Sequence, residues 1–344
     1  MSTRHLFAGV NSPLGFYSCF QSIIDQEKAA RIIYIKGGPG TGKSTLMKKI
    51  ASLCEDMGEP IEEFHCSSDP KSLDGVHIVN RKIALMDSTA PHIMEPKYPM
   101  VNGELFNAAE CLDHRRLQGK EEMLAKYCAV KDAAYKRGFQ YLKATEAIRS
   151  AIDKIYADIC DMKKAHKTVD NIIKRHMQKP SKLGNGTVRP LFLSVVTPDG
   201  FVSYLDGLCK NGIAVTIKEA GNPQAVFTRL VDHAVRNGYD VEIFLCPMNP
   251  KVQIENIHIP ELQLWISAHN GSNASDRLAH HWDDLDHLKL CEKGLIDGAV
   301  KAFNDAKQAH RAMENDIFIP AMDFEKLDKR VTQLLESLNL LQNT

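Results

Sequence analysis

The chain lacks several patterns that mark large classes of proteins. Its 43 Lys and Arg balance its 43 Asp and Glu, which weighs against a mainly electrostatic grip on nucleic acid or on an anionic membrane. Its nine cysteines include no C-x-x-C pair. This argues against a zinc ribbon or a disulfide framework and favours reduced thiols in a cytoplasmic protein. Residues 5–24 carry no formal charge, but polar residues interrupt them, so they suit neither a signal peptide nor a membrane span.

A glycine-rich motif stands out early in the chain. Residues 37–44 read G-G-P-G-T-G-K-S and match the Walker A pattern G-x-x-x-x-G-K-[ST]. The preceding run R-I-I-Y-I, residues 31–35, predicts a buried strand, and the following residues repeat apolar side chains at helical spacing up to Gly58. This order of strand, glycine loop and helix is the context in which the motif binds phosphates.

The chemistry of the motif assigns a role to each residue type. Glycines let backbone N–H groups approach phosphate oxygens, and the helix N-terminus adds partial positive charge. Lys43 is expected to reach the β- and γ-phosphates, and the hydroxyl of Ser44 to hold Mg²⁺. The predicted binding residues are Gly37, Gly38, Pro39, Gly40, Thr41, Gly42, Lys43, Ser44 and Thr45.

Acidic residues further along supply candidates for the remaining functions. Asp87 ends the apolar run I-A-L-M, residues 83–86, and resembles a Walker B carboxylate that holds Mg²⁺ together with Ser44. His65, Asp69 and Asp74 follow another predicted strand and are candidates for orienting the attacking water, with Asp69 the first choice. The predicted catalytic residues are Lys43, Asp87 and Asp69.

The sequence also contains an internal repeat. R-H-L-F-A-G-V-N-S-P-L-G-F from Arg4 matches R-P-L-F-L-S-V-V-T-P-D-G-F from Arg189, and G-E-P-I-E-E-F-H-C from Gly58 matches G-Y-D-V-E-I-F-L-C from Gly238. Matching segments keep their order and nearly constant spacing, which indicates a duplicated unit. Arg4 and Arg189 hold equivalent positions, and structural roles suit them better than catalytic ones.

The second copy differs where the phosphates would bind. Glu219 and Ala220 replace the first glycines, Ala225 replaces Lys43, and Val226 replaces Ser44. Ala268 falls opposite Asp87. We therefore expect the second half to keep the fold without binding a nucleoside triphosphate in the usual way.

These observations predict an α/β protein with two tandem P-loop-like three-layer units, the second degenerate, each followed by a helical appendage. Apolar residues spaced by four and three between Ile148 and Ile173 indicate long packed helices. The predicted segments are a core over 1–103, a helical hairpin or bundle over 104–179, a linker over 180–187, the degenerate unit over 188–270 and a second appendage over 271–344.

At the level of families, the chain resembles an uncharacterised bacterial family of duplicated P-loop ATPases. The resemblance spans nearly the whole chain and implies ATP binding and hydrolysis. It is carried by H-L-F-A-G (5–9), K-G-G-P-G-T-G-K-S (36–44), F-H-C-S-S-D-P (64–70), D-S-T-A-P-H (87–92), P-K-Y-P (96–99) and I-P-A-M-D-F-E-K (319–326).

The leading hypothesis is therefore an ATPase that uses ATP and Mg²⁺ at one site in the first half. The sequence has no N-K-x-D guanine signature, so adenine is the default base, and no L-S-G-G-Q segment, which weighs against an ABC transporter ATPase. The alternatives are a small-molecule or nucleoside kinase, with Arg115 and Arg116 as weak lid candidates, and a scaffold that senses nucleotide without turnover. The helical appendages suggest a protein partner, and a homo-oligomer stays open.

Overall fold

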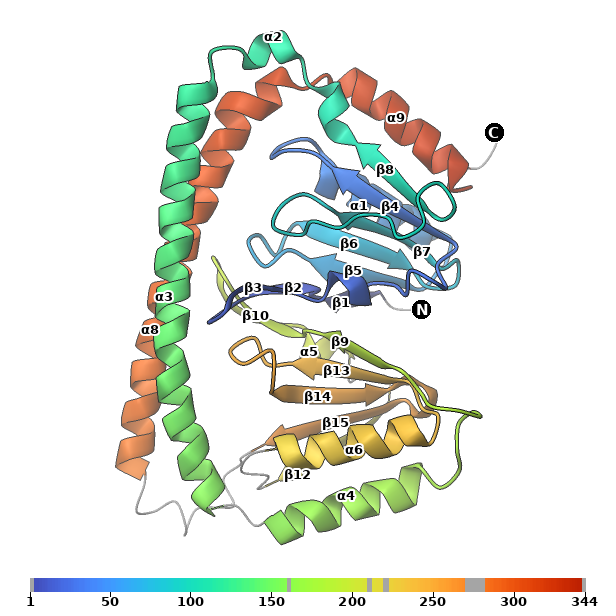
Figure 1. The fold of residues 1–344 in the computed structure, drawn as a ribbon, viewed down its shortest axis with the longest axis vertical. Helices are drawn as coiled ribbons and strands as arrows, with labels where there is room; N and C mark the ends of the chain where they lie inside the picture. Colours follow the sequence, from blue (N-terminus) through green and yellow to red (C-terminus); the bar gives the residue numbers. More distant parts are fainter. Residues whose placement is uncertain (1–2, 160–161, 209–211, 219–222, 270–281, 342–344) are drawn as a thin grey trace.

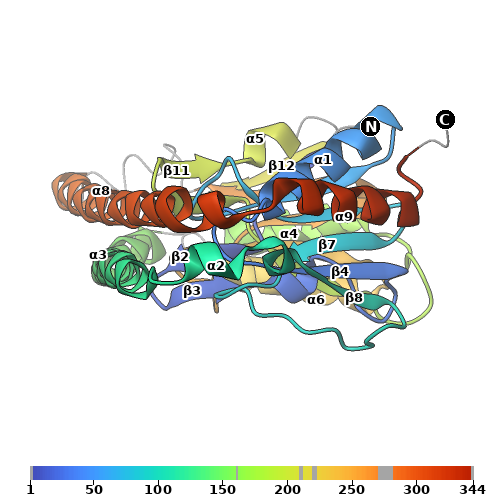
Figure 2. The same cartoon turned by 90° about the horizontal axis from the view of Figure 1, so that it is seen from above.

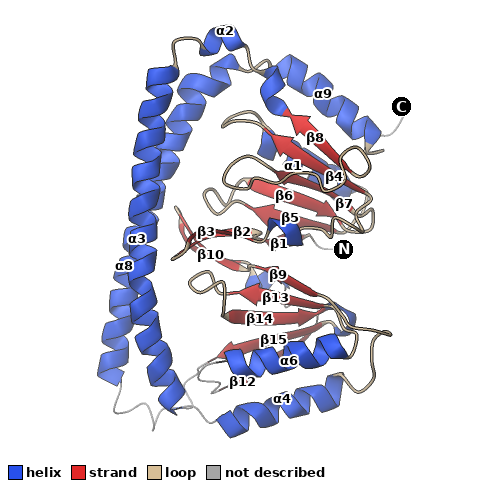
Figure 3. Ribbon diagram, in the orientation of Figure 1, coloured by secondary structure: helices blue, strands red, loops and turns tan. Residues whose placement is uncertain are grey.

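The computed structural model describes residues 3–159, 162–208, 212–218, 223–269 and 282–341. Two larger β-sheets follow one another along the long axis of the molecule, and a pair of long helices runs along one side of both (Figure 1, Figure 3). The mixed α/β class predicted from the sequence is confirmed.

The first half holds a six-stranded sheet in the order β1-β5-β6-β7-β4-β8. Its elements are β1 (Arg4–Leu6), β2 (Gly9–Ser12), β3 (Gly15–Ser18), η1 (Phe20–Ser22), β4 (Arg31–Lys36), α1 (Lys43–Asp56), β5 (Ile61–His65), β6 (Leu73–Ile78), β7 (Ile83–Asp87), β8 (Gly103–Asn107), η2 (Ala108–Cys111) and α2 (His114–Leu117). Strand β6 is antiparallel to both of its neighbours, whereas the other pairs in this sheet are parallel. The strand before the glycine loop, the helix after it and the strand ending at Asp87 all form where the sequence predicts them.

The second half repeats the first five strands of this order, without β8, as a five-stranded sheet in the order β9-β13-β14-β15-β12. Its elements are β9 (Val188–Leu191), β10 (Ser194–Thr197), β11 (Gly200–Ser203), α5 (Leu205–Leu208), β12 (Ile213–Lys218), α6 (Gln224–Arg236), β13 (Val241–Leu245), β14 (Ile254–Ile259), η4 (Pro260–Leu262) and β15 (Leu264–His269). Even an irregularity is shared, because the register shifts after Phe64 in β5 and after the equivalent Phe244 in β13. The duplication seen in the sequence is thus a duplication of topology.

The two sheets meet at the edges formed by β1 and β9. The backbone N–H of Phe7 donates to the carbonyl of Phe192, and the N–H of Phe192 donates to the carbonyl of Phe7, both at 3.0 Å. Phe7 and Phe192 hold equivalent positions in the repeat. An equivalent residue contacting its own counterpart is the mark of an approximate two-fold axis.

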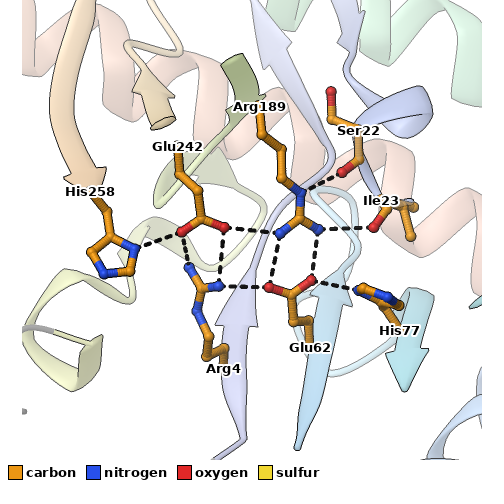
Figure 4. A network of polar contacts seen from close by, with 8 residues as sticks. All are labelled: Arg4, Ser22, Ile23, Glu62, His77, Arg189, Glu242 and His258. Atoms are coloured by element: carbon orange, nitrogen blue, oxygen red, sulfur yellow. Dashed lines mark hydrogen bonds and ion pairs between the residues drawn. The ribbon is translucent and has the colours of Figure 1, made fainter. Parts of the chain in front are cut away.

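A buried charge network surrounds this axis (Figure 4). Arg4 donates to Glu62 at 2.7 Å and to Glu242 at 2.6 Å, and Arg189 donates to Glu62 at 2.6 Å and to Glu242 at 2.9 Å. The imidazoles His77 and His258 contact Glu62 and Glu242 respectively, at 2.9 and 2.7 Å. Arg4 and Arg189 are therefore structural cations between the halves, as the sequence suggests.

The remaining helices connect the halves in a way that the sequence does not reveal. They are α3 (Glu121–Ile159), α4 (Met162–His176), α8 (Trp282–Met313), the π-helical segment η6 (Glu314–Phe318), η7 (Ile319–Ala321) and α9 (Phe324–Ser337). Helix α4 follows the first unit but buries Ala165, Val169 and Ile172 in the core of the second sheet. Helix α9 follows the second unit but buries its apolar face with α1 and the first sheet. Each half therefore completes the core of the other.

The long helices α3 and α8 pack against each other in opposite directions beside both sheets (Figure 1, Figure 2). Two glycines allow close contact, because a methyl group at Gly138 would come within 2.3 Å of Phe303 and one at Gly298 within 2.7 Å of Tyr141. Within the described part of the chain, no helix has the length and apolar character needed to cross a membrane.

Candidate functional site

The glycine loop lies between the end of β4 and the start of α1. Gly40 and Gly42 have φ angles of 67° and 83°, in the left-handed region that glycine adopts without a steric penalty. Gly42 also caps the N-terminus of α1. The loop thus turns into the end of the helix where unpaired N–H groups and the helix dipole favour an anion.

Lys43 folds back over this loop. Its Nζ donates to the carbonyl oxygens of Gly37 and Gly38, at 2.8 Å each. The same Nζ lies 3.7 Å from Oδ2 of Asp87. The structure therefore brings together the two predicted catalytic residues with the clearest sequence signals.

Parallel pairing of β4 with β7 explains why Asp87 reaches the loop. Ile35 pairs with Asp87, and parallel strands present their carboxyl ends at one edge of a sheet. The N–H of Thr89 donates to Oδ1 of Asp87 at 2.8 Å, and the hydroxyl of Thr89 donates to the Gly37 carbonyl at 2.9 Å. Ser44 is anchored from another strand, because its Oγ accepts from the N–H of Leu73 at 2.9 Å.

A segment from the far end of the chain covers the loop. The N–H of Gly40 donates to Oε1 of Glu314 at 3.0 Å, although the two residues are 274 positions apart. A methyl group at Gly38 would lie 3.2 Å from Phe318, and one at Gly40 would lie 2.9 Å from Ile319. Sequence reasoning missed Glu314 as a site residue, because a single glutamate at the end of a long helix carries no binding motif.

Asp74 is the buried carboxyl of the site, and it was one of the predicted water-orienting candidates. Burial raises the pKa of Asp74 to about 6, with the charge of Asp87 acting in the same direction, while His92 and Lys43 oppose the shift. His92 Nε2 lies 3.5 Å from its Oδ2. Asp74 is therefore electrostatically coupled to both Lys43 and Asp87.

Asp69, the first choice for that role, has other partners. Its carboxylate lies 3.1 Å from Nζ of Lys307 on α8 and accepts from the Ser72 hydroxyl at 3.2 Å. Burial acts to raise the pKa of Asp69, but the hydrogen bond and charge of Lys307 outweigh it and lower the pKa. Ionised Asp69 thus ties the loop after β5 to the long helix. His65, the third candidate, approaches the Pro70 carbonyl with Nδ1 at 2.8 Å.

The equivalent region of the second half lacks these side chains. Ala225 and the buried Val226 occupy the positions of Lys43 and Ser44 at the start of α6. Ala268 on β15 pairs with Ile217 as Asp87 pairs with Ile35. Glu219 and Ala220 lie outside the described residues.

Fold and site define a mixed α/β protein with a glycine-rich loop at the N-terminus of α1 in its first half. A family model described as Nephrocystin 3, N-terminal, matches residues 17–100, a stretch that includes the glycine loop and Asp87. The chain is similar to that domain over this part of its length. No curated protein and no solved structure matches the chain.

Proposed function

We propose that the chain binds ATP with Mg²⁺ at the glycine loop of its first half and hydrolyses it there. In this proposal both halves are P-loop-like units, and the second has lost its site. The observation that carries the proposal is the carboxylate of Glu314 on the N–H of Gly40, with the ammonium of Lys43 on the same loop. A loop amide that already donates to an anion is turned in the direction that a phosphate oxygen requires.

Each residue of the site has a separate role in this proposal. Lys43 would neutralise charge on the β- and γ-phosphates, and the Ser44 hydroxyl and Asp87 would hold Mg²⁺, which supplies further charge neutralisation when bound. Asp69 stays our predicted water-orienting residue, and the buried Asp74 is a second candidate because its raised pKa suits proton transfer near neutral pH.

A nucleotide-sensing scaffold is the second candidate function, and one contact favours it. Glu314 directly follows α8, the helix that runs beside both halves. A phosphate that took the place of Glu314 at Gly40 would therefore act on the end of that helix. For the kinase alternative, Arg116 is engaged elsewhere, because it donates to the Pro320 carbonyl at 2.8 Å.

The deciding experiment compares Lys43→Ala with Lys49→Ala in nucleotide binding and phosphate release. Lys49 is an exposed lysine on the same helix and serves as the control. Loss of the charge-assisted contact should weaken ATP binding about 10- to 100-fold, and turnover should fall further because the charge is greatest in the transition state. Unchanged binding and turnover in Lys43→Ala would refute the site. Binding without turnover in the parent protein would select the sensor over the ATPase.

A further inference from the structure

A second cluster of chemically active side chains lies on the opposite edge of the first sheet from β8. His5 on β1 pairs in register with Glu63 on β5, and His65 follows two residues later on the same face of β5 because side chains alternate along a strand. These three side chains converge on one point. The distance from His5 Nδ1 to His65 Nε2 is 3.0 Å, and Glu63 Oε2 lies 3.2 Å from the first nitrogen and 3.7 Å from the second.

These separations are close to those of ligands around one small metal ion. Nitrogen and oxygen ligands lie about 2.0–2.2 Å from zinc, so the edges of a tetrahedral site measure roughly 3.3–3.6 Å. The three distances, 3.0, 3.2 and 3.7 Å, lie within about 0.3 Å of this range. Two imidazoles and one carboxylate are ligands that zinc and similar transition metals prefer, whereas Mg²⁺ and Ca²⁺ favour oxygen alone.

The surroundings of the cluster also suit a metal. His65 Nδ1 lies 2.8 Å from the Pro70 carbonyl, and a carbonyl can only accept, so Nδ1 carries the hydrogen and Nε2 presents its lone pair to the cluster. A backbone carbonyl behind a ligating imidazole is a common support in metal sites. The side chain of His5 is 46% exposed, which leaves an open side where water could complete the coordination. Lys48 on α1 opposes a cation electrostatically, but it is exposed and therefore screened by solvent.

The repeat provides an internal comparison for these residues. On the same two strands of the second half, Arg189, Glu242, Leu191 and Phe244 keep the residue types of Arg4, Glu62, Leu6 and Phe64. The positions of the cluster change together: Pro190 replaces His5, Ile243 replaces Glu63 and Leu245 replaces His65. All three changes remove a ligand atom. The cluster is thus not needed to build the strands, which the second half forms without it.

We propose that His5, Glu63 and His65 bind a divalent transition-metal ion, with zinc as the best fit, at a site separate from the glycine loop. The ion would join β1 to the end of β5. It would also fix the start of residues 66–72, the loop that carries Asp69 and leads to the contact between Leu73 and Ser44. This inference does not depend on the proposed ATP site.

The test is metal binding by the full chain and by matched variants. Zn²⁺ is titrated by calorimetry into the parent protein, His5→Gln, His65→Gln and the control His114→Gln, whose histidine is exposed on α2. Other histidines and cysteines can bind zinc, so the difference between variants decides. We expect the parent and the control to bind one more equivalent than the two cluster variants, or to bind it at least about 10- to 100-fold more tightly.

A spectroscopic measurement guards against a folding artefact. Co²⁺ in a tetrahedral or five-coordinate nitrogen and oxygen site should give visible absorption in the parent and the control, and this absorption should be lost in His5→Gln. Because about half of the His5 side chain is exposed, the circular dichroism and the melting temperature of the metal-free variant should match the parent. Equal Zn²⁺ binding and equal Co²⁺ spectra in the parent and His5→Gln would overturn the proposal.

Discussion

The two halves of this molecule share a fold but not a site. Both place equivalent strands in the same order, both carry the same register shift, and both contribute one arginine, one glutamate and one histidine to the network at the axis. They differ beside the carboxyl ends of the strands. Lys43, Ser44 and Asp87 of the first half correspond to Ala225, Val226 and Ala268 of the second half. Residues that build the sheet and its junction are thus retained, whereas those suited to bind phosphate occur in one copy.

One retained position shows how the surroundings change the use of a side chain. Asp74 on β6 and Glu255 on β14 are equivalent, and burial raises the pKa of both carboxyls. Each also has a hydrogen-bonding cysteine, Cys66 or Cys246. In the first half the neighbouring groups are His92, Asp87 and Lys43, whereas in the second the neighbouring charge is Arg149 from α3. The same buried acid therefore lies beside a candidate site in one half and beside a structural cation in the other.

The largest expected effect comes from mutating the charge network at the axis, to which both halves contribute. Glu62→Ala and Glu242→Ala should each lower the free energy of unfolding by about 3–5 kcal/mol, because each leaves two buried arginines to share a single carboxylate. Denaturant unfolding measures this, with Glu104→Ala as the control, since Glu104 pairs with Arg31 nearer the surface and should matter by about 1 kcal/mol or less. A clearly smaller loss for one glutamate than for the other would show that the symmetry of the contacts is not a symmetry of energies.

The second prediction concerns pH and separates Asp74 from Glu255. The folded-state pKa of Asp74, about 6, lies above the usual aspartate value of 3.8. Its contribution to stability is therefore present below about pH 4 and is lost as the pH rises through 6. Asp74→Asn should remove this loss, so its free energy of unfolding at pH 8 should exceed that of the parent by up to about 3 kcal/mol. Unfolding curves recorded from pH 4 to 8 measure the difference. Glu255→Gln is the matched variant, and its free energy of unfolding should rise by less. A similar gain in both variants would show that the charges around Asp74 have no specific effect.

The third prediction tests the difference between Asp87 and its counterpart Ala268 at the strand ends. Asp87→Asn keeps the size of the side chain but removes the charge beside Lys43 and the expected Mg²⁺ position. We expect ATP turnover to fall roughly 100-fold, with the dissociation constant changed only a few-fold. Phosphate release and equilibrium binding measure the two quantities, and Asp56→Asn, at the exposed end of α1, is the control. Turnover at the parent level would leave Asp87 as a turn residue that holds Thr89.

The smallest expected effect concerns Glu314, a residue of the second half that contacts the glycine loop of the first. Glu314→Gln should weaken the contact with Gly40 by about 1 kcal/mol, since a neutral amide oxygen accepts less strongly than a carboxylate. Because phosphate would compete for the same N–H, ATP should bind roughly 5- to 10-fold more tightly. Glu325→Gln, exposed on α9, is the control. Weaker ATP binding in Glu314→Gln would instead mean that Glu314 assists the nucleotide.

Local patterns in the sequence were enough to predict a large part of this molecule. The strand before the loop, helix α1 and the strand ending at Asp87 follow from apolar runs, glycine positions and helical spacing over short segments. The duplication follows from matched letters at constant spacing, and it implied that the second half would form the same strands. These features depend on neighbours within a few residues, or on a comparison of the chain with itself.

Only the tertiary structure decided which distant segments meet. The exchange of α4 and α9 between the halves, the contact of Glu314 with Gly40 and the joining of four charges around the axis connect residues far apart in the chain. The cluster of His5, Glu63 and His65 likewise depends on the parallel register of β1 with β5. Such contacts are fixed by how buried faces pack and how strands align, because the free energy of burial does not depend on separation along the sequence.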